Sequence, residues 1–215
     1  DRNKELIMFG AIFGDIIGGR FDRHNYKRKA FELFDGFCRF TDDTVLTCAT
    51  AFAIQNNQCY GETYKRFYSL YPEKGYGPRF RQWAGGDACD PYYSLGNGSA
   101  MRVSPIPWLF DTLHQVHFEA IKSAKVTHNH PEGVKGAVAV AEAIFLGRKG
   151  VSKAEIRSRI CSVYGYNLNF SLDEIRPTYR FDMTCPGSVP QAVVAFLESD
   201  DFESAIRNAI SIGGD

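Results

Sequence analysis

Thr41-Asp42-Asp43-Thr44 sets two carboxylates side by side at the start of an apolar run, Val45–Ile54. The apolar residues of this run recur at helical spacing, which places the acidic pair at the N-terminus of a helix. One interpretation is capping, because Thr41 or Asp42 can accept the backbone N–H groups that a helix start leaves unpaired. The other is a divalent metal site, because adjacent carboxylates repel unless a cation lies between them, and magnesium and calcium prefer carboxylate and hydroxyl oxygens. The motif by itself leaves both interpretations open.

Length and charge limit the classes of protein to consider. A chain of 215 residues is long enough for one well-buried domain and short for two, so we expect a single domain over residues 1–215. Its 25 basic and 25 acidic residues cancel, which gives no general attraction to nucleic acid or to a membrane. The longest apolar stretch, Ala137–Leu146, contains Glu142 and is too short to span a bilayer. The six cysteines are scattered without a CxxC motif, so we expect free thiols and a cytoplasmic protein.

Helical periodicity dominates the chain. No pair of alternating runs is joined by an Asn-Gly or Asp-Gly turn, so we expect no β-sheet and an all-α fold. The predicted helices cover Glu5–Gly18, Asp42–Gln55, Tyr60–Tyr71, Ser99–Phe110, Val116–Lys125, Pro131–Gly147, Ser152–Tyr164, Val189–Ser199 and Phe202–Ile212.

Two long segments interrupt this plan, Gly19–Phe40 and Gly165–Gly187. Loops of this length within a compact domain are usually functional lids or disordered segments. The first carries a cluster of basic residues, which is equally consistent with an ordinary solvated face.

Glycine recurs every fourth residue at Gly10, Gly14 and Gly18, along one face of the first predicted helix. Each glycine in a helix interior costs about 1 kcal/mol relative to alanine, so this face needs a reason. We expect another helix or a loop to pack closely on it. Asp15, in the middle of the pattern, is expected to hydrogen-bond a neighbouring loop rather than to do chemistry.

Two further motifs carry polar groups. Leu95-Gly-Asn-Gly-Ser-Ala-Met-Arg102 gathers backbone N–H groups and a hydroxyl before a predicted helix, which suits phosphate oxygens but is also ordinary turn and cap chemistry. Thr127-His-Asn-His-Pro131 places His128 and His130 between two predicted helices, where either can simply make a loop or cap hydrogen bond. Neither spacing indicates zinc.

Taken together, these motifs resemble the ADP-ribosylglycohydrolases, including the dinitrogenase-reductase-activating glycohydrolase type and the ADP-ribose hydrolases. They stand in the family's order over nearly the whole chain: Gly10-x-x-x-Gly-Asp-x-x-Gly18, Phe40-Thr-Asp-Asp-Thr44, Gly96-Asn-Gly-Ser-Ala-Met-Arg102, Thr127-His128 before Gly133, and Cys185-Pro-Gly-Ser-Val-Pro-Gln-Ala192.

The resemblance implies a compact orthogonal helical bundle that removes ADP-ribose from a modified protein, nucleic acid or small molecule with two magnesium or manganese ions. It makes Thr41, Asp42 and Asp43 metal ligands. It places the ADP-ribose site at Asn97, Gly98, Ser99, Ala100 and Met101, with His128 as a further contact.

Two departures from the family pattern concern the reaction. A glutamate that commonly acts near the metals is matched here by Asp22, which is one methylene shorter. Ser211-Ile-Gly-Gly-Asp215 resembles the start of the family's second acidic motif, so Asp215 would be another metal ligand. We expect the rest of that motif, and the family's C-terminal end, to be missing from this chain. The alternative function is therefore a catalytically impaired relative that binds ADP-ribose or has a structural role.

Overall fold

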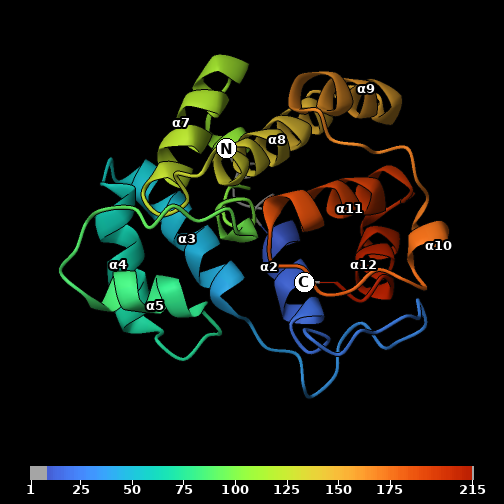
Figure 1. The fold of residues 1–215 in the computed structure, drawn as a ribbon, viewed down its shortest axis with the longest axis horizontal. Coiled ribbons are helices and arrows are strands. Elements are labelled where there is room, and N and C mark those ends of the chain that lie inside the picture. Colours follow the sequence, from blue (N-terminus) through green and yellow to red (C-terminus); the bar gives the residue numbers. More distant parts are fainter. Residues whose placement is uncertain (1–8, 215) are drawn as a thin grey trace.

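The computed structural model describes residues 9–214, which form helices joined by irregular segments (Figure 1). The all-α expectation is confirmed, since the only β-type pairing within these residues is an isolated antiparallel bridge between Gly96 and Thr184. The helices are α2 (Phe9–Gly18), α3 (Asp42–Gln55), α4 (Tyr60–Leu70), α5 (Pro78–Gly85), the 3-10 turn η1 (Asn97–Ser99), α6 (Ile106–Leu109), α7 (Leu113–Lys125), α8 (Pro131–Arg148), α9 (Lys153–Tyr164), α10 (Leu172–Ile175), α11 (Cys185–Leu197) and α12 (Phe202–Ser211).

Helix α2 lies between α3, α4 and α5 on one side and α11 and α12 on the other (Figure 1). It packs against both α3 and α12. One hydrophobic cluster joins α3, α4 and α5, and a second joins α8, α9 and α11. A third cluster joins α6, α7 and α8. Helix α8 therefore buries apolar side chains in two of the three clusters.

Helix α12 packs on the glycine face of α2 at Gly10 and Gly14, at distances that would leave an added Cβ in ordinary van der Waals contact, and a Cβ on Gly18 would meet nothing within 4 Å. A Cβ atom on Gly10 would lie 3.8 Å from the ring of Phe202, and one on Gly14 would lie 3.4 Å from Ile206. Both partners belong to α12. The predicted start of this helix, residues 5–8, lies outside the described residues.

The single helix predicted over Ser99–Phe110 was wrong. The structure has the turn η1, a run of turns, and then the short helix α6. Pro105 and Pro107 explain the difference, because proline lacks an N–H donor and disfavours helical backbone in the residue before it.

Other boundaries moved because cap residues were overlooked. Helix α11 begins at Cys185 rather than Val189, since the Thr184 side chain accepts a hydrogen bond from the N–H of Gly187. Helix α7 begins at Leu113 because Thr112 caps it in the same way. The short helices α5 and α10 were not predicted.

Two further sequence expectations concern the whole chain. All six cysteines are free thiols. Within residues 9–214, no helix combines the length and the apolar character needed to cross a bilayer.

Candidate functional site

Asp15 of α2 holds the start of α3. Its Oδ2 accepts hydrogen bonds from the backbone N–H groups of Thr41 (2.8 Å) and Thr44 (3.1 Å) and from the Thr44 hydroxyl, and its Oδ1 accepts from the Thr41 hydroxyl (2.6 Å). The expectation that Asp15 bonds a neighbouring segment is confirmed. Thr41 is the N-cap of α3, and its Oγ1 accepts from the N–H of Asp43 at 3.3 Å. The capping interpretation of this motif therefore holds.

Capping uses only part of the hydrogen-bonding capacity of the Thr41 hydroxyl. A hydroxyl has one hydrogen and two lone pairs. The Thr41 hydroxyl lies 2.6 Å from Asp15 Oδ1 and 3.3 Å from Asp43 Oδ2, and we assign its hydrogen to the nearer oxygen, that of Asp15. One lone pair accepts from the backbone N–H of Asp43, and the second lone pair can serve another partner. The two carboxylates beside it, Asp42 and Asp43, complete an oxygen-only set of the kind that magnesium or manganese prefers.

The loop at Lys74 and Gly75 fixes the position of Asp42. The N–H of Asp42 donates to the carbonyl of Lys74 at 2.7 Å, and a Cβ on Gly75 would lie 3.2 Å from Asp42 Oδ1. Gly75 has φ +100°, in the left-handed region that favours glycine. The acidic pair is thus packed from one side and part-buried.

The expected metal ligands are brought together only in part. Thr41, Asp42 and Asp43 lie together at the start of α3, but the expected ligand Asp215 lies outside the described residues. Within residues 9–214, no group of three or more His, Cys, Asp or Glu side chains is placed to hold a metal ion. The described donors fit a hard divalent ion in kind and form an incomplete set in number.

Asp22 lies in the turn that follows α2 and is exposed. Its carboxylate is 3.6 Å from the guanidinium of Arg23, which is also exposed. Two residues beyond Arg23, the backbone of Asn25 is so close to Gly213 that a Cβ on Gly213 would lie 2.7 Å away. The turn that carries Asp22 therefore lies near the start of the second acidic motif.

The motif Gly96–Arg102, where an ADP-ribose site was expected, folds as a tight turn around Asn97. The carbonyl of Asn97 accepts from the N–H groups of Ala100 (2.8 Å) and Met101 (3.0 Å), so these two amides are occupied within the chain. The side chain of Ser99 is buried and donates to the carbonyl of Gly133 at 2.7 Å. Of the expected contacts in this turn, Ser99 and Ala100 are thus buried in packing, and the part-buried Gly98 remains the candidate for a ligand contact.

His128 lies against this turn, although it is 30 residues further along the chain. A Cβ on Gly98 would lie 3.1 Å from His128 Nε2, and one on Gly96 would lie 3.4 Å from the same atom. Helix α3 is also close, since Thr47 Oγ1 donates to the carbonyl of Met101 at 3.4 Å. The structure thus connects the helix that carries Asp42 and Asp43 with the turn that carries the expected ADP-ribose contacts.

Sequence reasoning gave no role to Arg102 or Thr127, although both stand inside quoted motifs. Arg102 is completely buried, and its Nη2 donates to Thr127 Oγ1 at 2.8 Å. Thr127 Oγ1 is in turn 2.8 Å from His128 Nδ1. The only sequence signal for this chain of contacts was the threonine directly before the histidine.

The two long loops meet. Lys27 Nζ, in the first, donates to the carbonyl of Tyr179 in the second at 2.7 Å, and the guanidinium of Arg23 lies 5.7 Å from the ring centroid of Phe181. Desolvation by burial, assisted by nearby arginines, lowers the pKa of Lys27. These loops form one surface instead of two separate ones.

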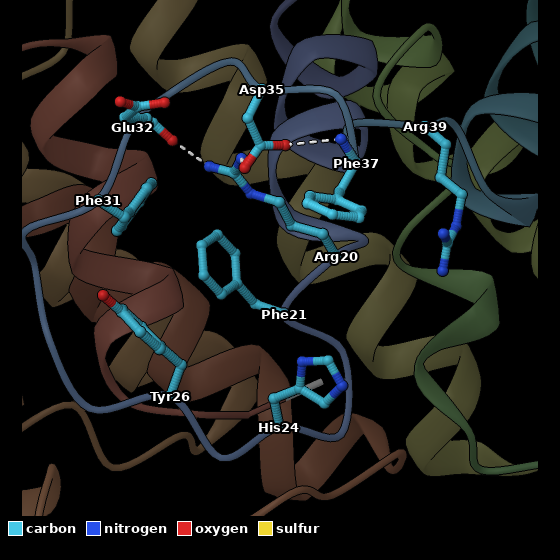
Figure 2. A pocket seen from close by; sticks show the side chains of 9 residues that line it. All are labelled: Arg20, Phe21, His24, Tyr26, Phe31, Glu32, Asp35, Phe37 and Arg39. Carbon is cyan, nitrogen blue, oxygen red and sulfur yellow. Dashed lines mark hydrogen bonds and ion pairs between the residues drawn. The ribbon is translucent and has the colours of Figure 1, made fainter.

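The first loop lines an open cavity of about 570 Å³ at the surface (Figure 2). Arg20 extends across it to Asp35 and the carbonyl of Glu32, and aromatic rings lie beside it (Figure 2). Gly19, directly before the lining residue Arg20, packs on the start of α3, because a Cβ on Gly19 would lie 2.9 Å from the Thr41 side chain. Its lining residues are Arg20, Phe21, His24, Tyr26, Phe31, Glu32, Asp35, Phe37 and Arg39.

Comparison with known proteins adds independent information. ADP-ribosylhydrolase ARH3 of Mus musculus is 28% identical over 183 residues, covering 69% of this chain and 50% of its own length. The Homo sapiens protein of that name is 27% identical over 188 residues, with the same coverage. The chain thus spans about half the length of these curated relatives.

A solved structure described as an ADP-ribosylglycohydrolase-related protein complex has the same fold, with a TM-score of 0.74 at 20% identity. The match covers 97% of this chain and 80% of that one. The sequence model of the ADP-ribosylglycohydrolase family matches residues 6–215. This chain belongs to the ADP-ribosylglycohydrolase family.

Proposed function

We propose that the full-length protein is a hydrolase that removes ADP-ribose from a modified target by cleaving the glycosidic bond at the distal ribose, with two magnesium or manganese ions. The observation that carries the proposal is the α2–α3 junction. There, Asp15 and the Thr41 cap hold the first turn of α3, so that the Thr41 hydroxyl and the carboxylates of Asp42 and Asp43 stand on three consecutive residues. Family membership supports the reaction class.

In this proposal Thr41, Asp42 and Asp43 hold the metal, and Asp215 is a further ligand. A bound divalent ion supplies polarisation of the ribose hydroxyls and lowers the pKa of a bound water. The protein's own contribution is to place three oxygen donors at one helix start, which the hydrogen bonds from Asp15 and the Thr41 cap hold in position.

The ADP-ribose diphosphate is proposed to lie on the turn at Asn97. The backbone N–H group of Gly98, which is only part-buried, donates to its oxygens, and His128, which lies against Gly98, adds a second donor. The carbonyl of Asn97 holds the amides of Ala100 and Met101, which keeps the turn in shape.

Asp22 is proposed to position the attacking water, because a carboxylate near the anomeric carbon assists glycosidic cleavage through its oxocarbenium-like transition state. The leaving group is then read by the surface that the loops Gly19–Phe40 and Gly165–Gly187 form together, including the cavity in Figure 2. Six free thiols are in keeping with a cytoplasmic location for this reaction.

Metal binding is tested by the melting temperature of the full-length protein with and without magnesium or manganese. An ion that binds only the folded state stabilises it by about 2.7 kcal/mol at a concentration 100 times its Kd. Asp42→Asn with Asp43→Asn should abolish this response. The matched control is Asp200→Asn with Asp201→Asn, an adjacent acidic pair at the start of α12, which should keep it. An equal response in both double variants would refute the assignment.

Turnover and binding are tested together. With divalent metal, Asp22→Ala should lower the rate of ADP-ribosyl hydrolysis far more than it weakens ADP-ribose binding, because the carboxylate acts in the transition state. Asp22→Glu should retain activity. Tight binding of ADP-ribose by a wild-type protein that cannot hydrolyse any ADP-ribosyl linkage would identify the alternative, a binding relative. The exposed Asp22–Arg23 pair is the feature that favours this alternative.

A further inference from the structure

Arg102 is a cation buried without a counter-charge. Its side chain is completely buried, and no carboxylate within residues 9–214 forms an ion pair with it. Its guanidinium lies 4.3 Å from the ring centroid of Tyr64, and Nη2 donates at 2.8 Å to the carbonyl of Ser123 and to Thr127 Oγ1. Burying an unpaired charge is costly, so a role beyond packing is to be expected of this arginine.

Thr127 connects Arg102 with His128 through two hydrogen bonds of its hydroxyl group. Arginine can only donate, so the Thr127 oxygen is an acceptor towards Arg102. The hydroxyl hydrogen of Thr127 is then free to go to His128 Nδ1, which lies 2.8 Å away. An imidazole nitrogen that accepts a hydrogen bond has no proton of its own, so the ring proton of the neutral His128 is on Nε2.

The Nε2 atom that carries this proton lies against the turn around Asn97. Nε2 is the ring atom that faces the turn, as the 3.1 Å and 3.4 Å approaches to Cβ positions on Gly98 and Gly96 show. A Cβ on Gly133 would lie 3.1 Å from His128 Cβ and 2.6 Å from the carbonyl of Ser94, so Gly133 packs closely against the base of the His128 side chain. His128 therefore presents one fixed donor to the turn.

We propose that Arg102 and Thr127 are positioning residues that hold His128 as a neutral Nε2–H donor aimed at a phosphate oxygen of ADP-ribose. This inference rests on the proposed ADP-ribose site and adds the two residues that determine how its histidine works. Burial and the charges of Arg102 and Arg79 also lower the pKa of His128 well below its usual value, which keeps the ring neutral. A neutral donor at this position recognises the ligand by geometry and hydrogen bonding, not by net charge.

Tyr92 is the competing partner. Its ring lies edge-on to that of His128, with centroids 5.8 Å apart, and its hydroxyl is a second potential acceptor for the Thr127 hydrogen. If Tyr92 took that hydrogen, Nδ1 of His128 would have to donate to Thr127, and Nε2 would become an acceptor that repels phosphate oxygen. The two arrangements predict opposite tautomers of one ring.

The experiment measures that tautomer by ¹⁵N NMR of His128 in the ligand-free, full-length protein. A pyridine-type Nδ1 and a pyrrole-type Nε2 are expected in the wild type. Thr127→Val keeps the shape of the side chain and removes the hydroxyl, so the Nε2–H preference should be lost. Thr127→Ser should restore it. Thr63→Val, which removes another buried threonine hydroxyl bonded to the carbonyl of Cys59, should leave the tautomer unchanged.

ADP-ribose titration supplies the second measurement. Loss of one hydrogen bond of this kind corresponds to a Kd about tenfold higher, which is expected for Thr127→Val and not for Thr127→Ser or Thr63→Val. A wild-type His128 with its proton on Nδ1, or a Thr127→Val variant with an unchanged tautomer, would overturn the inference. Absence of ADP-ribose binding in a wild-type protein that still shows the Nε2–H tautomer would count against the proposed function and against the ligand named here, and not against the tautomer.

Discussion

A single buried histidine can report on the site without any ligand. Burial and two nearby arginines, Arg102 and Arg79, lower the pKa of His128 well below the value of 6.5 that it has in an unfolded chain. Between the folded-state pKa and pH 6.5, His128 is therefore protonated in the unfolded state and neutral in the folded state. Stability from this residue is fully present above pH 6.5 and is lost as the pH falls from there towards the lower, folded-state pKa.

We therefore expect the free energy of unfolding to fall by up to about 1.4 kcal/mol for each pH unit below 6.5 on account of His128. His128→Gln, which cannot titrate, should remove this part of the slope. Urea unfolding of both proteins between pH 7.5 and 5.5 provides the measurement. Parallel curves for wild type and His128→Gln would mean that the histidine is protonated as easily in the folded chain as in the unfolded one.

Between elements, the junction of α2 and α3 is held by a cap from another helix. Most helix starts are capped by a residue of their own, as Asp201 caps α12. At α3, Thr41 provides the local cap, and Asp15 of α2 accepts four more hydrogen bonds from Thr41 and Thr44. The pair of helices and the acidic motif are thereby fixed as a unit.

Asp15→Ala should therefore cost about 2–3 kcal/mol of stability, because several part-buried donors lose their acceptor at once. Asp201→Ala, which removes one local cap, should cost only about 1 kcal/mol. Chemical denaturation gives both values. In addition, Asp15→Ala should weaken metal binding through the displaced Thr41 hydroxyl, while Asp201→Ala should not. Equal losses of stability in the two variants would show that Asp15 acts as an ordinary cap.

The helix boundaries show which parts of the fold can be predicted from the sequence. Helices with clear signals at both ends, such as α3 after Thr41 and α8 after His130, were predicted at their true starts, Asp42 and Pro131. Segments dominated by turns were not, and Ser99–Phe110 broke into pieces because its prolines outweighed its apolar spacing. Asp15 and Arg102 stand in motifs that the sequence shows, and a hydrogen bond from Asp15 to a neighbouring segment was expected. Which residues they bond was not predictable, because Arg102 bonds Thr127 across 25 residues and Asp15 bonds Thr41 across 26.

At the scale of the molecule, α8 connects the packing of the core with the site. Ala139 and Ala143 lie in the cluster shared with α9 and α11, while Val138 and Ala141 lie in the cluster shared with α6 and α7. Near its N-terminal end, at Gly133, the carbonyl accepts the buried hydroxyl of Ser99. A shift of α8 relative to α11 would therefore also move the turn around Asn97, which is bonded to α8 through Ser99.

Gly136 is where that contact is closest. A Cβ on Gly136 would lie 2.4 Å from Cys185 Sγ and 2.7 Å from Cys185 Cβ, so alanine cannot be added without moving the start of α11. Cys185 in turn donates from its N–H to the carbonyl of Leu95 at 2.9 Å, directly before the turn. We expect Gly136→Ala to cost about 1–3 kcal/mol through overpacking and to weaken ADP-ribose binding as well.

Gly147→Ala in the same helix is the matched control, since a Cβ there would meet nothing closer than 4.0 Å. It should stabilise the protein by up to about 1 kcal/mol, because alanine has the higher helix propensity, and leave binding unchanged. Thermal unfolding and ADP-ribose titration of the two variants separate the effects. If Gly136→Ala proved as stable as Gly147→Ala, α8 and α11 would have room to move apart. If it lost stability but bound ADP-ribose normally, the packing at Cys185 would not be what holds the turn in place.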